Sequence, residues 1–217
     1  MSLPSIDPLA LFNIKGQSAV VIGATGAFGQ VVCATLGKSG ARLTIAAGNA
    51  ETLDELATEL SLEDIEATQV ARRPNTEADC DAIVAAAVEA YGGIDILVIA
   101  SGMNDISPIE DMEPERFQKV MLANVEGAWL IARSVGRQMI AQGRGGKVVI
   151  TSSARGKLGH PAGYSAYCTS KAATDGMTKA LGCEWGKYNI TVNAIAPTVF
   201  RSPVTAWMFE DNENANE

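Results

Sequence analysis

Residues that hold metals or covalent cross-links are scarce in the 217-residue chain. It has one histidine, His160, and its four cysteines are widely scattered with no Cys-x-x-Cys pair. Both absences argue against a zinc site, so no residue is assigned to a metal. Scattered thiols are typical of proteins that stay reduced, and we therefore expect a cytoplasmic location. The cysteines are Cys33, Cys80, Cys168 and Cys183.

Long apolar runs are also absent. No stretch approaches the ~18 apolar residues that a membrane-spanning helix requires, so no membrane partner is expected. The first fifteen residues contain one acid and one base and lack a continuous apolar stretch, so no secretory signal is expected. Apolar residues nevertheless make up 47% of the chain and charged residues 19%, which excludes a disordered protein.

Positive charge is in short supply. Lysines and arginines number 17 against 25 acidic residues, which gives a net charge of −8. Residues 210–217 alone carry four acids and no base, so the remainder has a net charge of only −4. Nucleic-acid binding requires the opposite sign, and we expect no nucleic-acid partner.

Short apolar, β-branched runs alternate with longer helical stretches. Nearly continuous apolar runs are typical of parallel strands that are covered on both faces. The alternation predicts a doubly wound, Rossmann-like α/β fold, and no repeat or linker divides residues 1–217 into more than a single domain. Strands are predicted at 18–22, 42–46, 67–71, 94–100, 147–152 and 191–196, and helices near 27–39, 50–61, 77–91, 113–143 and 165–187.

A glycine-rich loop follows the first predicted strand. Gly23, Gly26 and Gly29 stand three residues apart, between the strand and a helix. Such a loop lets backbone N–H groups approach a pyrophosphate, and the helix N-terminus adds partial positive charge at the same point. The loop therefore favours a dinucleotide site, although a tight strand–helix turn without a ligand has the same pattern.

The second predicted strand lacks the acidic residue that would bond the adenosine ribose hydroxyls. It ends Ala46-Ala47-Gly48-Asn49, with no carboxylate to repel a 2′-phosphate and no arginine to hold one. Arg72 and Arg73 follow the third strand and either reach the adenosine end or are solvated loop charges. The cofactor is expected to be NADP or NAD, with NADP favoured.

Tyr167 and Lys171 are four residues apart and so share one face of a predicted helix. An adjacent ammonium stabilises a phenolate and lowers the pKa of a tyrosine, which suits acid–base chemistry. The spacing alone is common in helices, but Ser152 and Ser153 end the fifth predicted strand just upstream. Carboxyl ends of parallel strands line the ligand crevice, where a serine hydroxyl can bond a substrate oxygen.

With these features the sequence resembles the short-chain dehydrogenase/reductase family over residues 10–205. Six motifs carry the resemblance in the expected order along the predicted strands and helices. They are G-A-T-G-A-F-G at 23–29, I-A-S-G at 99–102, A-N-V-E-G around Asn124, T-S-S-A-R-G at 151–156, Y-C-T-S-K at 167–171 and I-T-V-N-A-I-A-P at 190–197.

The resemblance implies a role for each of four catalytic residues. Tyr167 would be the general acid/base, and Lys171 would hold the nicotinamide ribose and depress the tyrosine pKa. Ser153 would orient the reacting oxygen, with Ser152 as its neighbouring candidate. Asn124 would hold a water that links Lys171 to solvent. The implied cofactor-binding residues are Gly23, Thr25, Gly26, Phe28, Gly29, Ala100, Ser101, Gly102, Tyr167, Lys171, Pro197, Thr198 and Phe200.

The chain departs from the family pattern at several points. The middle glycine of the first loop comes one residue early, and residues 99–102 lack an asparagine that normally braces the central strands. An aspartate that normally meets the adenine is replaced near Arg73, and Ser153 and Tyr167 are fourteen residues apart where thirteen is commoner. The family's last helix and strand are also expected to be missing, with residues 206–217 forming a partial lid and an acidic tail.

The resemblance implies an NAD(P)-dependent oxidoreductase that interconverts a secondary alcohol and a ketone. Two alternatives stay open: a catalytically silent or truncated dinucleotide-binding protein, and an epimerase that reuses its bound cofactor. The substrate is a small molecule, and Arg155, Lys157 and Arg201 either meet an acidic substrate or are surface charges. The helical regions 113–143 and 165–187 are expected to form a homodimer or homotetramer.

Overall fold

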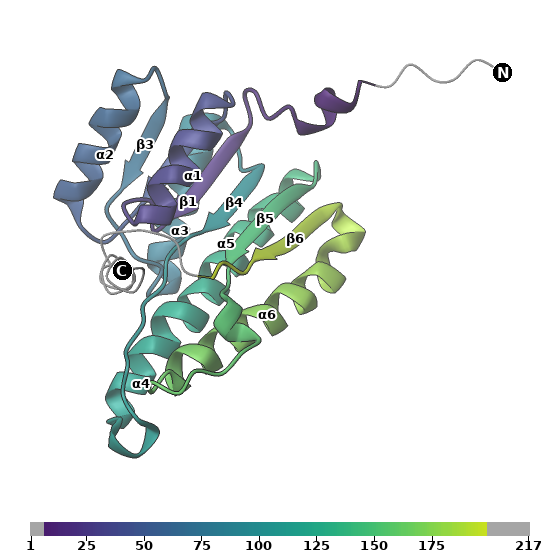
Figure 1. Ribbon diagram of the computed structural model, residues 1–217. Helices are drawn as coiled ribbons and strands as arrows, with labels where there is room; N and C mark the ends of the chain where they lie inside the picture. Colours follow the sequence, from purple (N-terminus) through teal and green to yellow (C-terminus); the bar gives the residue numbers. More distant parts are fainter. Residues whose placement is uncertain (1–6, 199–217) are drawn as a thin grey trace, which may run out of the picture.

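The computed structural model describes residues 7–198 and contains one six-stranded, fully parallel sheet in the order β3-β2-β1-β4-β5-β6. The order reverses after β1, so a crevice is expected where β1 and β4 diverge at their carboxyl ends. Figure 1 shows α2 and β3 at one end of the sheet and α6 and β6 at the other. The strands are β1 (Ser18–Ile22), β2 (Arg42–Ala46), β3 (Ala67–Val70), β4 (Ile96–Ile99), β5 (Gly146–Thr151) and β6 (Ile190–Ile195).

Helices connect each strand to the next, as the alternating sequence pattern predicts. The doubly wound α/β class is therefore confirmed, and so is the parallel sheet. The α-helices are α1 (Ala27–Lys38), α2 (Ala50–Leu62), α3 (Glu77–Tyr91), α4 (Pro114–Met121), α5 (Gly127–Gln142) and α6 (Ser165–Trp185). Short 3₁₀ turns are η1 (Pro8–Phe12), η2 (Ile109–Asp111), η4 (Ala154–Gly156) and η5 (Gly186–Tyr188).

The predicted helix over 113–143 is not continuous. A five-residue π-helical segment, η3 (Leu122–Glu126), separates α4 from α5. The helix starts at Pro114, whose missing N–H costs nothing in a first turn, and it ends where Gly143 adopts a left-handed φ of 68°. The sequence pattern thus predicted both ends, but the wider turn in the middle has no signature in the spacing of apolar residues.

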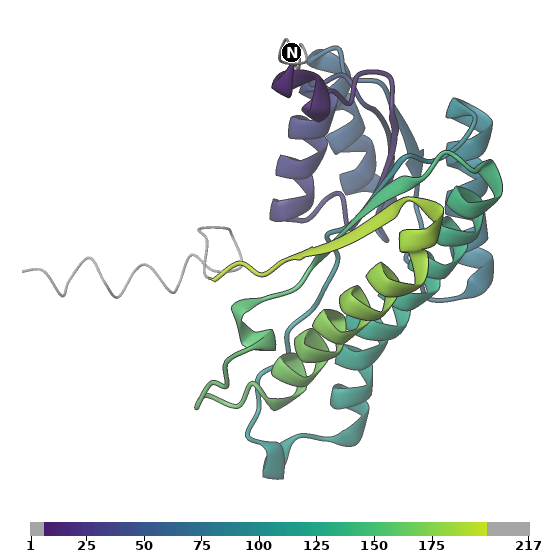
Figure 2. The same ribbon diagram turned by 90° about the vertical axis from the view of Figure 1, so that its right-hand side faces the viewer.

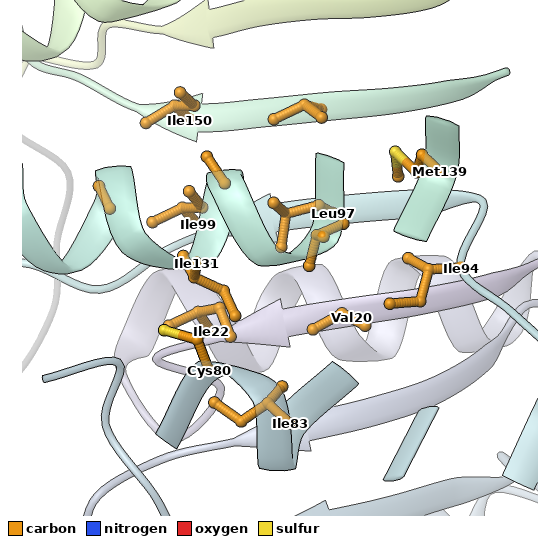
Figure 3. Close-up of a cluster of buried hydrophobic side chains, with 14 of the residues drawn as sticks. Val20, Ile22, Cys80, Ile83, Ile94, Leu97, Ile99, Ile131, Met139 and Ile150 are labelled. Atoms are coloured by element: carbon orange, nitrogen blue, oxygen red, sulfur yellow. The ribbon is translucent and has the colours of Figure 1, made fainter. Parts of the chain in front are cut away.

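Two apolar clusters hold the helices on the sheet. One cluster joins β1, β4 and β5 to α3 and α5, and Figure 3 shows Ile22, Ile99 and Ile150 of the strands near Ile131 and Ile83 of the helices. The other packs α1 and α2 against the opposite face of β1 and β2. At ~25 cal/mol per Å² of buried apolar surface, these clusters supply the main stabilisation of the fold.

The two faces of β6 differ in their cover. Figure 2 shows α6 packed along one side of this strand. On the other side Thr191, Asn193 and Ile195 are exposed, and no helix within residues 7–198 lies over them. The predicted tail at 206–217 lies outside the described residues.

Candidate active site

The candidate site lies along the carboxyl edge of the sheet. The loops that follow β1, β4 and β5 leave the same edge because the strands are parallel and in register, with Ile22 paired to Ile99 and Ile99 paired to Ile150. The glycine loop, residues 99–102 and the Ser152-Ser153 segment are thereby brought together. Helix α6 packs against the turn that follows β5 and brings Tyr167 and Lys171 to the same edge.

The glycine loop has a geometry that only glycine allows at two positions. Gly23 has φ of 76°, and a Cβ there would lie 2.7 Å from the Cα of Ser101. A Cβ at Gly29 would lie 2.1 Å from the carbonyl oxygen of Gly23. The N–H of Gly26 donates to that same oxygen at 3.1 Å, so the early middle glycine still closes a tight turn.

The start of α1 fits the pyrophosphate of a dinucleotide. Gly26 is the N-cap residue and offers no side-chain cap, and the first turn of α1 contains no acidic side chain. The N–H groups of a first helical turn have no partners within the helix, and an anion placed there satisfies them. Thr25 and Phe28 flank the N-cap residue of α1, and their contact with a cofactor stays a prediction.

The two arginines after β3 have different surroundings. Arg72 donates to Asp79 at 2.8 Å and is about half exposed, so its charge is balanced on α3. Arg73 instead lies over Gly48 at the end of β2, where a Cβ would be 2.2 Å from its Nε atom. The Arg73 guanidinium thus fills the space that a side chain at position 48 would take, at the edge where an adenosine ribose is held.

Residues 99–102 line the middle of the site. The N–H of Ala100 continues the ladder to Ile22 at 2.9 Å, and Ser101 packs against Gly23. A Cβ at Gly102 would lie 3.3 Å from Asn124 Oδ1 and 3.4 Å from Lys171 Nζ. Gly102 therefore lets the chain pass between two of the predicted catalytic side chains.

Asn124 lies in the π-helical segment with its side chain only 3% exposed. Its amide donates to the carbonyl of Met103 at 2.8 Å and to Ser170 Oγ at 2.9 Å, and its Oδ1 accepts from the N–H of Met103 at 2.7 Å. Asn124 thus ties the segment after β4 to α6. Both of its amide hydrogens are used, so a water in the predicted relay would need a carbonyl oxygen here.

Tyr167, Ser153 and Lys171 come together from α6 and the end of β5. Lys171 Nζ donates to the carbonyl of Thr151 at 2.7 Å and lies 5.6 Å from the centre of the Tyr167 ring. Burial raises the pKa of Tyr167, which outweighs the lowering by its hydrogen bond with Ser153. The pKa of Tyr167 therefore lies above its ordinary value, and its depression by Lys171 stays a prediction.

Burial also affects the lysine. Lys171 is 4% exposed, and its desolvation lowers the pKa from 10.5 to about 8 against the attraction of Asp175. The side chain is still an ammonium at neutral pH. A cation at this point can stabilise negative charge on a phenol or on a bound ribose hydroxyl.

The neighbouring candidate Ser152 is bonded to another residue, and a second tyrosine lies beside Tyr167. Ser152 Oγ donates to Asp175 Oδ1 at 2.7 Å, which leaves Ser153 as the serine beside Tyr167. The ring of Tyr164 makes an edge contact with Tyr167 at 6.3 Å between centroids and packs on His160 at 4.5 Å. Tyr164 thus lies next to Tyr167, the tyrosine that is four residues from Lys171.

Asp175 is a buried charged residue beside the site that the sequence did not single out. It lies on α6 four residues after Lys171, so helical spacing from the Tyr-x-x-x-Lys motif would have found it. It pairs with Lys157 at 2.8 Å, while Arg155 donates to the carbonyl of Gly159 at 2.9 Å. Of the three cations that the sequence offered to an acidic substrate, Arg155 and Lys157 are therefore engaged by groups of the protein itself.

Some predicted residues lie at or past the limit of the described chain. The carbonyl of Pro197 accepts from the N–H of Ala154 at 2.9 Å, which joins the end of β6 to the serine loop. Thr198 is exposed, and its predicted contact with the nicotinamide stays a prediction. Phe200 and Arg201 lie outside residues 7–198.

Metal-binding clusters and membrane-spanning helices are both absent from the part of the chain that the structure describes. No group of three or more His, Cys, Asp or Glu side chains is placed to hold a metal ion there. None of the described helices is both long and apolar enough to cross a membrane.

Comparison with known proteins identifies the class to which this fold and site belong. Residues 17–213 match the short chain dehydrogenase family, so the chain belongs to that family. An uncharacterized oxidoreductase of Mycobacterium tuberculosis is 50% identical over 94% of this chain and 75% of its own length. The NAD-dependent glycerol dehydrogenase of Listeria innocua is 34% identical over 94% of this chain and 79% of its own length.

Solved structures agree with this assignment. A gluconate 5-dehydrogenase from Burkholderia cenocepacia, crystallised with NADP and tartrate, superposes with a TM-score of 0.86 at 27% identity. The alignment covers 93% of this chain and 78% of the other. The chain is thus an NAD(P)-dependent dehydrogenase/reductase of the short-chain type that acts on a CH–OH/C=O pair.

Proposed function

We propose that the protein interconverts a secondary alcohol and a ketone with Tyr167 as the general acid/base. The observation that carries this proposal is the convergence of Tyr167, Ser153 and Lys171 beside the glycine loop. A nicotinamide dinucleotide, when bound at that loop, supplies or accepts the hydride. The side chains of the protein then have to supply the proton, the position and the electrostatic stabilisation.

Each of the three side chains has a distinct task in the reduction of a ketone. The Tyr167 hydroxyl, which burial keeps protonated, donates its proton to the carbonyl oxygen as negative charge develops there. The Ser153 hydroxyl holds the same oxygen and fixes its direction towards Tyr167. The Lys171 ammonium stabilises the phenolate that the proton transfer leaves behind.

The phenolate is reprotonated through the lysine. Lys171 Nζ has a fixed bond to the carbonyl of Thr151 and two further hydrogens. In the proposal one of these hydrogens passes to the Tyr167 phenolate and is replaced from a water at a carbonyl oxygen of the Asn124 segment, which restores the ammonium. A bound nicotinamide ribose would be held beside the same ammonium. The π-helical turn at Asn124 supports this role, since such turns occur frequently at functional sites.

We further propose that the protein prefers NADP to NAD. Ala46, Ala47 and Gly48 offer no carboxylate to repel a 2′-phosphate, and the Arg73 guanidinium fills the space over Gly48. Arg73 has no acidic partner among the ion pairs within residues 7–198, whereas Arg72 is neutralised by Asp79. Arg73 is therefore the cation that is available to a phosphate at this end of the site.

The relatives support a polyol as the substrate. Several are named for glycerol, sorbitol, galactitol or threitol, and each of these molecules offers secondary hydroxyls to the proposed site. Arg155 and Lys157 are engaged by groups of the protein itself, so neither of these two cations favours a sugar acid. We propose a neutral polyol, and a cytoplasmic location in keeping with the four free thiols.

The first test is a titration with NADPH and NADH that follows energy transfer from tryptophan to the reduced nicotinamide. We expect saturable binding of both, about tenfold tighter for NADPH, and loss of that preference in Arg73→Ala. Arg72→Ala is the matched control and should keep the preference. Equal affinity for the two cofactors in the wild-type protein would refute the NADP assignment.

The second test measures turnover on a panel of polyols, with gluconate as the acidic member. Tyr167→Phe should lower kcat by at least ~100-fold while cofactor affinity stays unchanged. Equal rates for the wild type and Tyr167→Phe would favour a silent dinucleotide-binding protein. Turnover without a net change in nicotinamide absorbance would instead favour an epimerase.

A further inference from the structure

Asp175 is a buried carboxylate that the proposed chemistry does not use. It lies on α6 one turn beyond Lys171 and is 8% exposed. One oxygen, Oδ1, accepts from Ser152 Oγ at 2.7 Å. The other, Oδ2, lies 2.8 Å from Lys157 Nζ in an ion pair rather than in an aligned hydrogen bond.

Both partners of Asp175 belong to the loop that carries Ser153. Ser152 immediately precedes Ser153, and Lys157 follows it after the single 3₁₀ turn η4. A Cβ at Gly156 would lie 2.7 Å from Asp175 Oδ2 and 2.9 Å from the carbonyl oxygen of Lys171. The backbone of the loop therefore rests directly on α6, and glycine at 156 is what permits this approach.

We propose that Asp175 is a positioning residue that fastens the Ser153 loop to the helix that carries Tyr167 and Lys171. Ser153 comes from the end of β5 and Tyr167 from α6, so their separation depends on how firmly these two elements are joined. Asp175 joins them on both sides of Ser153, through a hydroxyl and through an ammonium. The catalytic part of this inference rests on the proposed function, whereas the fastening of the loop does not.

The electrostatics of Asp175 are consistent with a permanently charged anchor. Burial raises the pKa of Asp175, but Lys157, Ser152 and the more distant Lys179 outweigh it and hold the pKa below its ordinary value. The charged groups that face the carboxylate are thus Lys157 from the loop and Lys171 and Lys179 from its own helix. Its negative charge in turn favours the ammonium form of Lys171.

Hydrogen exchange of the free protein tests the fastening directly. The amides of Gly156, Lys157 and Leu158 are bonded within the turn, so their exchange reports its opening. Asp175→Asn keeps the size of the side chain and an acceptor for Ser152 but removes the charge, and Lys157→Met removes the cation. Both should speed exchange in the 153–158 segment by about tenfold, and Lys157→Arg should restore slow exchange.

The control for exchange is Lys187→Met, which removes an exposed lysine after the end of α6. If the amides of the 153–158 segment exchange no faster in Asp175→Asn and Lys157→Met than in this control, the inference is overturned. The measurement requires neither substrate nor cofactor. It therefore gives an answer even if Tyr167→Phe has shown that the proposed function is wrong.

Kinetics test the catalytic part. Both variants should lower kcat by about tenfold or more with little change in the Kd for NADPH, because the cofactor loop is not touched. Asp175→Asn should also move the alkaline limb of the pH profile to lower pH, since Lys171 loses the carboxylate that favours its charged form. Lys157→Met keeps that carboxylate and should not move the limb downwards. Coincident pH profiles for the two variants would overturn this part of the inference.

Discussion

At the scale of single residues, the site is built around a buried positive charge. Lys171 has few exposed atoms, and desolvation holds its pKa at about 8 instead of 10.5. Both the folded and the unfolded protein bind this proton at pH 7, and the folded state bears the cost of burying it. Buried charges of this kind are typical of catalytic sites, where the protein loses some folding stability in exchange for function.

Lys171→Met should therefore change how stability depends on pH. Between pH 8 and 10.5 the unfolded chain keeps the Lys171 proton and the folded protein does not, so this residue makes the wild type more stable as pH rises. The free energy of unfolding of Lys171→Met, relative to the wild type, should fall by about 3 kcal/mol across that window. Denaturant unfolding at several pH values measures it. Lys187→Met, at an exposed site, should give a flat difference, and a flat difference for Lys171→Met would contradict the shifted pKa.

At the scale of elements, local sequence patterns predicted the positions of the strands and of the glycine turns, because these depend on periodicity and turn chemistry. The strands were predicted to within two residues at each end, and Gly23 and Gly29 were identified because close backbone approaches require glycine. The π-helical turn was not predicted, because it depends on a long-range contact between Asn124 and Met103. The same is true of the Asp175 contacts, which join residues more than fifteen positions apart.

The role of Asn124 in joining elements gives a prediction for stability. Asn124→Ala should lower the free energy of unfolding by about 2–4 kcal/mol, because it leaves the partly buried N–H and carbonyl of Met103 without their partner. The matched control is Asn193→Ala on the exposed side of β6, which should change stability by less than about 0.5 kcal/mol. Urea unfolding compares the two. Similar values for both variants would mean that the hydrogen bonds of Asn124 do not hold the segment after β4.

At the scale of the whole molecule, the outer surface of α4 and α5 is unusually apolar. Phe117, Leu122 and Trp129 are 39%, 39% and 50% exposed, and they line a groove of about 880 Å³ together with Met121 and Met177. The rim carries both signs of charge, from Glu115, Lys119 and Glu126. A surface with an apolar centre and a rim of both signs can pair with a second copy of itself. We propose a homodimer or homotetramer through this surface and the adjacent α6.

Trp129→Glu tests this assembly, because it places a charge at the centre of the proposed contact. Light scattering coupled to size exclusion should find the wild type as a dimer or tetramer at micromolar concentration, and Trp129→Glu should dissociate at least ~10-fold more readily. Val31→Glu is the matched control. Val31 is 62% exposed and lies on α1, which is not part of the α4–α5 groove. A wild-type monomer, or dissociation to the same extent in both variants, would exclude the α4–α5 surface. A stable assembly that Trp129→Glu alone disrupts would mean that each copy covers the apolar groove of another.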